Sequence, residues 1–167
     1  MTQLIIEDGT GVDLANSFAD DAEFTAYANL RGLTVPATVA AREILLILAM
    51  DYLFNIELKF QGVRVPDGLL PWPRRGAYAF GVLVPSTGAG SIPSGIKNAQ
   101  IELALQCVTD KLLINSTNQN VQQEKIGTLE VKYFSGGSWS EVMTGRANAY
   151  LKPYFINGGN NNRLVRI

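Results

Sequence analysis

The sequence predicts a mainly α-helical protein, a small helical bundle with a long Gly/Pro-rich loop and a small β-hairpin. Four segments have helical periodicity or capping signals, at about residues 20–31, 37–54, 93–113 and 140–152. Residues 61–91 carry ten glycines and prolines, through which regular structure cannot persist. Residues 121–134 alternate around Gly127, as the two strands of a hairpin do.

The first two helices have clear local signals. Asp20 and Glu23 have the spacing of a capping box, and Gly32 suits the C-terminal end of the first helix. The second helix begins near Pro36 or Thr38, and its residues 44–50 are apolar on every face. A helix without a polar face is surrounded by protein, so we expect it at the centre of the core.

The third helix has two apolar stripes where a monomer usually needs one. One stripe holds Ile96, Ala99, Leu103 and Cys107, and the other holds Ile101, Leu105, Val108 and Leu112. The helix is therefore sandwiched, either between core elements or between its own subunit and a neighbour. We favour the neighbour.

The long loop contains the first candidate interaction residues. Trp72, between two prolines, either anchors a partner or staples the loop to its own core, and we favour the staple. Arg74 and Arg75 have no obvious partner inside the loop, so we expect them to meet a neighbouring subunit or DNA, with a solvated loop tip as the alternative. Aromatic residues in the loop argue against disorder.

The C-terminal segment supplies the remaining candidates. Residues 157–162 are Gly and Asn only, which predicts a flexible linker after a domain of residues 1–156. The arm that follows consists of Arg163, Leu164, Val165, Arg166 and Ile167. It is either a frayed end or an arm that docks on a partner by strand addition, and its composition favours the arm.

Composition excludes several function classes. The formal net charge is −1, without the basic excess of a free-standing nucleic-acid binder. Histidine is absent, Cys107 is the single cysteine, and no phosphate-loop motif occurs. Asp8, Asp20 and Asp21 fit turns and caps better than a cation site. We therefore expect no catalytic residue, no cofactor and no metal, and hence no enzyme.

The sequence also indicates where the protein is located. The longest apolar run is far shorter than the roughly 20 residues of a membrane span, and the N-terminus does not read as a signal peptide. A lone cysteine suits a reducing cytoplasm. We expect no membrane association.

The order of several motifs resembles a known family. They are the motifs of residues 6–11 (IEDGTG), 49–53 (AMDYL), 70–76 (LPWPRRG), 91–97 (SIPSGIK), 102–105 (ELAL), 124–127 (EKIG) and 130–133 (EVKY). Over about residues 4–155, the chain resembles the head–tail connector, or adaptor, proteins of tailed bacteriophages. Many of these are labelled "DnaT-like single-stranded DNA-binding protein". The arm lies outside the resemblance.

The resemblance implies a structural virion protein of the neck, assembled in the host bacterial cytoplasm. Its partners would be copies of itself in a ring, commonly a dodecamer, together with the portal protein and a downstream neck or tail-completion protein. Genomic DNA would pass through the channel during ejection without sequence-specific binding. The alternative is a single-stranded DNA-binding protein of phage replication, which the family's label suggests.

Overall fold

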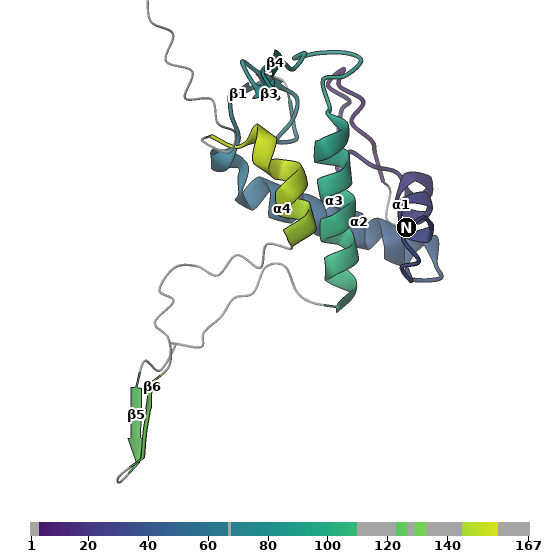
Figure 1. The fold of residues 1–167 in the computed structure, drawn as a ribbon. Coiled ribbons are helices and arrows are strands. Elements are labelled where there is room, and N and C mark those ends of the chain that lie inside the picture. The colour runs from purple at the N-terminus through teal and green to yellow at the C-terminus, as the bar shows by residue number, and fades with distance from the viewer. Residues whose placement is uncertain (1–3, 67, 110–122, 127–128, 133–144, 157–167) are drawn as a thin grey trace, which may run out of the picture.

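The computed structural model describes residues 4–66, 68–109, 123–126, 129–132 and 145–156 (Figure 1). The α-helices in these ranges are α1 (Asp21–Asn29), α2 (Val39–Asn55), α3 (Ser94–Thr109) and α4 (Gly145–Leu151). Two 3₁₀ turns, η1 (Glu57–Lys59) and η2 (Lys152–Tyr154), follow α2 and α4. The prediction of a mainly helical small domain is confirmed, although residues 110–113 and 140–144 of the expected helices lie outside the described residues.

The described strands pair into two-stranded antiparallel hairpins. β5 (Gln123–Ile126) pairs with β6 (Leu129–Lys132), as the sequence predicted. The Gly/Pro-rich segment also holds β1 (Val63–Arg64) with β2 (Arg74–Arg75), and β3 (Tyr78–Ala79) with β4 (Val82–Leu83). The prediction of a long loop without regular structure is therefore wrong in part. Two-residue strands leave no periodicity that a sequence pattern can detect.

The helix starts follow from local capping. The Asp20 carboxylate accepts from the Glu23 N–H at 2.7 Å, and the Glu23 carboxylate accepts from the Asp20 N–H at 3.1 Å, which confirms the capping box. The Thr38 side chain caps α2. Gly32 has a φ of +64°, a left-handed conformation that glycine adopts at little cost.

α3 lies between α2 and α4 (Figure 1). From the first stripe, Ile96, Ala99 and Leu103 are fully buried, and from the second Ile101 is buried. Helices of the same chain therefore cover the first stripe as far as Leu103, whereas in the second stripe Leu105 is half-buried, Val108 is 45% exposed and Leu112 lies outside the described residues. Packing within the chain explains the first stripe, and contact of the second stripe with a neighbouring subunit stays a prediction.

α2 is not buried on every side. Leu46, Ala49 and Leu53 face the core, whereas Ile44 and Leu48 are 46% and 45% exposed. The prediction of a central helix is wrong for this face. An apolar sequence shows that a helix can be buried all round, but only the packing decides which faces are covered.

Gln100 fastens the N-terminal segment to the helices. Its buried amide donates to the Ser17 hydroxyl at 2.8 Å and to the Leu46 carbonyl at 2.9 Å. Its oxygen accepts from the N–H groups of Phe18 and Ala19. All four hydrogen-bonding positions of the amide are used, so α3 holds both the segment before α1 and the middle of α2.

Candidate functional site

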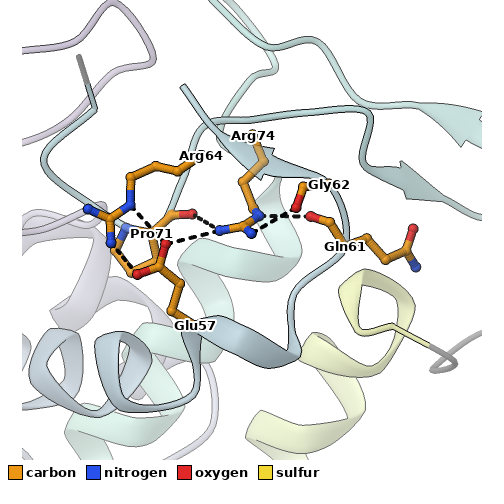
Figure 2. A network of polar contacts seen from close by, with 6 residues as sticks. All are labelled: Glu57, Gln61, Gly62, Arg64, Pro71 and Arg74. Carbon is orange, nitrogen blue, oxygen red and sulfur yellow. Dashed lines mark hydrogen bonds and ion pairs between the residues drawn. The ribbon is translucent and has the colours of Figure 1, made fainter. Parts of the chain in front are cut away.

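A buried arginine organises the segment after α2. The Arg74 guanidinium donates to the carbonyls of Gln61 at 2.7 Å and Gly62 at 2.9 Å (Figure 2). It also donates to the Pro71 carbonyl and to the Glu57 carboxylate, each at 3.2 Å. Only 8% of its side chain is exposed. The guanidinium therefore binds three backbone positions and one counter-ion.

The Glu57 carboxylate is shared by two guanidinium groups. Arg64 donates to it through Nε at 2.8 Å and through Nη2, opposite the contact from Arg74 (Figure 2). The Arg64 hydrogen bonds hold the pKa of Glu57 below its ordinary value, and the Arg64 and Arg74 charges add to this effect. Burial lowers the pKa of Arg74, which Glu57 opposes. Two positive charges thus meet one negative charge.

Aromatic packing fixes the same loop from the other side. Trp72 is fully buried and packs edge-on against Phe60 and Tyr154, with ring centroids 6.0 and 5.5 Å apart. Gln61 adds polar links, because its side-chain amide donates to the carbonyls of Pro153 and Phe155. The loop is consequently tied to the end of the described chain.

The strand register decides which arginine faces outward. Arg64 pairs with Arg74 and Val63 with Arg75 across β1 and β2, so each pair shares one face. Arg74 points toward Glu57, and the next residue must then point away. Arg75 is accordingly exposed beside Val63, which is 71% exposed.

The hairpin β3–β4 displays apolar side chains just after Arg75. Phe80 and Gly81 form its two-residue turn with φ values of +53° and +81°, the pattern of a type I′ turn. Asparagine or glycine usually occupies the first position, and a bulky residue there costs of order 1–3 kcal/mol. Phe80 is nevertheless 87% exposed. Tyr78 and Leu83 share one face of the hairpin, and Ala79 and Val82 share the other. We call the exposed side chains of both faces, together with those of the turn and of the preceding strand β2, the hairpin surface: Arg75, Tyr78, Phe80, Val82 and Leu83.

A second polar cluster ties α1 to α3 and α4. The Tyr27 hydroxyl donates to buried Glu102 at 2.6 Å, and the Arg31 guanidinium lies 3.4 Å from the centroid of the Tyr27 ring. Burial and the bond to Glu102 raise the pKa of Tyr27. Near the N-terminus, buried Glu7 accepts from three backbone N–H groups of its own turn. The Tyr27–Glu102 cluster and the Glu7 turn therefore stabilise the fold.

The sequence-predicted site residues separate into three groups. Trp72 is buried, which confirms the staple. The expectation that Arg74 lacks an internal partner is wrong, because its acceptors follow from a fold that brings residues 57, 61, 62 and 71 together. Arg75 is exposed, and its interaction role stays a prediction, whereas Arg163, Leu164, Val165, Arg166 and Ile167 lie outside the described residues.

Sequence reasoning missed Phe80 as a candidate. It had used the loop aromatics only as an argument against disorder. The available signal was the dipeptide Phe80-Gly81 between two short apolar pairs, which is a weak hairpin pattern.

In the described part of the chain, no helix is long and apolar enough to cross a membrane. Within the same ranges, His, Cys, Asp and Glu side chains do not gather in threes that could hold a metal ion.

Fold and site define a small, mainly helical protein whose anchored loop displays an aromatic hairpin. A family model described as "Putative DnaT-like ssDNA binding protein" matches residues 2–167, and the chain belongs to this family. No curated protein and no solved structure matches the chain. The DnaT-like part of the resemblance is thereby confirmed, and the connector part stays a prediction.

The two neighbouring arginines should differ sharply in their effect on stability. Arg74→Ala leaves Glu57 with one partner and three carbonyls without a donor, and should lower the free energy of unfolding by about 3 kcal/mol. Arg75→Ala is the matched control and should change it by less than about 0.5 kcal/mol. Urea unfolding followed by circular dichroism measures both. Equal effects would contradict the inward and outward assignment.

Glu57 should also give the stability a pH dependence. Because folding lowers its pKa, its contribution is complete above the ordinary value of 4.5 and is lost as the pH falls through the lowered value. Wild type should therefore exceed Glu57→Gln in free energy of unfolding at neutral pH, and the difference should shrink below pH 4.5. Urea titrations across this range measure it, with Asp13→Asn as the exposed control. A difference that does not change with pH would refute this role.

Proposed function

We propose that this protein binds single-stranded DNA through the hairpin surface. The observation that carries the proposal is Phe80, a strained and exposed aromatic at the tip of a hairpin that also exposes Tyr78 and closely follows exposed Arg75. Proteins that bind single strands combine aromatic side chains, on which bases stack, with basic groups that contact the backbone. The chain's membership of a family described as single-stranded DNA binding supports the same function.

Charge is segregated in a way that suits this site. Residues 1–56 contain eight acidic and two basic residues, whereas residues 57–83 contain two acidic and four basic ones. Glu57 is engaged by Arg64 and Arg74. Lys59 in η1 and Lys152 in η2 are also exposed. The hydrogen bonds from Gln61 to the Pro153 and Phe155 carbonyls hold η2 beside the loop. Although the whole chain has a net charge of −1, residues 57–83 are basic, and we expect weak, salt-dependent binding of DNA there.

A head–tail connector is the second candidate. The observation in its favour is that large apolar side chains are exposed on several different elements, including Leu30 after α1, Ile44 on α2 and Leu58 in η1. A subunit of a closed ring needs two different contact surfaces, because its interfaces are heterologous. The resemblance to connector proteins also favours this candidate, whereas the description of the matched family names only single-stranded DNA binding.

DNA binding is tested by fluorescence anisotropy with a labelled oligothymidine. We expect a Kd of about 10⁻⁵ M or tighter at physiological salt, with a salt slope that Arg75→Ala reduces by about 0.7. Phe80→Ala should weaken binding by about tenfold through the loss of one stacked base. Leu30→Ala, 85% exposed and remote from the hairpin surface, is the control. Binding weaker than about 10⁻⁴ M, or unchanged in Phe80→Ala, would refute the proposal.

The connector is tested by sizing of the purified protein with and without portal protein, and by electron microscopy of isolated virion necks. A connector should appear as a ring between the portal and tail components, because its heterologous interfaces close. A protein that stays monomeric beside portal and is absent from purified virions would exclude this candidate. Neither result depends on the affinity for DNA.

A further inference from the structure

α2 presents an apolar stripe that the described residues leave uncovered. Ile44 and Leu48 lie one turn apart, with Ala40 exposed on the preceding turn and Ile47 half-buried beside them. We call Ala40, Ile44, Ile47 and Leu48 the α2 stripe. It lies in the middle of α2, whose opposite face packs into the core through Leu46, Ala49 and Leu53, so its exposure does not come from a frayed end.

Acidic side chains border the α2 stripe. Glu43 lies one turn before Ile47, and exposed Asp51 lies one turn after Leu48. Within the described part of the chain, neither carboxylate has an ion-pair partner. The complement of this surface is a segment that is apolar and basic. A second α2 stripe does not fit, because it would bring acidic borders together.

The described chain ends close to this helix. The N–H of Ile156 donates to the carbonyl of Lys59 at 2.7 Å, just past the C-terminal end of α2. Six linker residues follow, and they can span up to about 20 Å. Leu48 lies about 10 Å back along the helix from Asn55, and Ile44 about 17 Å, at 1.5 Å per residue. The segment after the linker can therefore reach the α2 stripe of its own chain.

We propose that residues 163–167 dock on the α2 stripe of the same chain. The arm approaches from the C-terminal end of α2, so Arg163 meets Asp51 and Arg166 meets Glu43. In a polyproline II conformation residues three apart face the same side, and three residues span about 9 Å, close to the roughly 12 Å that separate those two carboxylate positions along the helix. Leu164 and Ile167 then cover Leu48 and Ile44. The acceptor is a helix face, which replaces the strand addition expected from the sequence.

Disulfide trapping tests the docking in the full chain. In a Cys107→Ala background, Leu48→Cys is combined with Leu164→Cys, and the control combines Leu58→Cys, 92% exposed beside the start of the linker, with Leu164→Cys. Docking should make the intrachain disulfide form at least about tenfold faster at position 48, because it holds residue 164 there, whereas a free tethered arm meets position 58 at least as often. The rate should not depend on protein concentration. Circular dichroism checks that each variant is folded.

A charge exchange makes the test specific. Asp51→Arg should slow trapping several-fold, and Arg163→Asp added to it should restore the rate. Trapping at position 58 as fast as at position 48 would show a free end and overturn the proposal. Disulfide-linked dimers that increase with concentration would overturn it too, because the arm would then reach a second copy. An exchange without effect would remove the proposed pairing of Arg163 with Asp51.

Discussion

The buried guanidinium of Arg74 is the constraint on which the displayed part of the molecule depends. A charge with so little access to water must find its partners within the chain, and here it finds one carboxylate and three carbonyls from residues 57–71. These hydrogen bonds hold the loop around the Arg74 guanidinium. Since side chains alternate along a strand, the inward Arg74 makes Arg75 face outward and starts the β3–β4 hairpin from a fixed position.

The parts of the fold that the sequence predicted are those with local causes. The Asp20–Glu23 capping box, the ends of α1 and α2, and the β5–β6 hairpin depend on residues a few positions apart. The exposed face of α2 could not be predicted, because α3 and the loop decide which side is covered. Arg74 shows the same limit at the site: the residue was singled out, but its partners lie 3 to 17 positions away in a fold not yet known.

Polar residues inside the molecule serve mainly to fasten segments. Glu7 closes the N-terminal turn, Gln100 joins that segment to α2 and α3, and Glu57 holds the two arginines. Each is buried or half-buried with its oxygens bound, which leaves little capacity for an outside ligand. In the described part of the chain, the groups left for partners therefore include the aromatic and aliphatic side chains of the hairpin surface and the α2 stripe, other exposed apolar residues such as Leu30 and Leu58, and a few exposed cations.

These two surfaces impose different conditions on a function. The hairpin surface is basic and aromatic, so it can serve DNA whether or not the protein assembles. The α2 stripe can be covered by the chain's own arm or by a neighbouring subunit, but not by both at once. A tethered arm acts at a high effective concentration, so a neighbour prevails only if it adds contacts elsewhere, as ring closure would. The occupant of α2 therefore bears on the connector candidate and leaves DNA binding untouched.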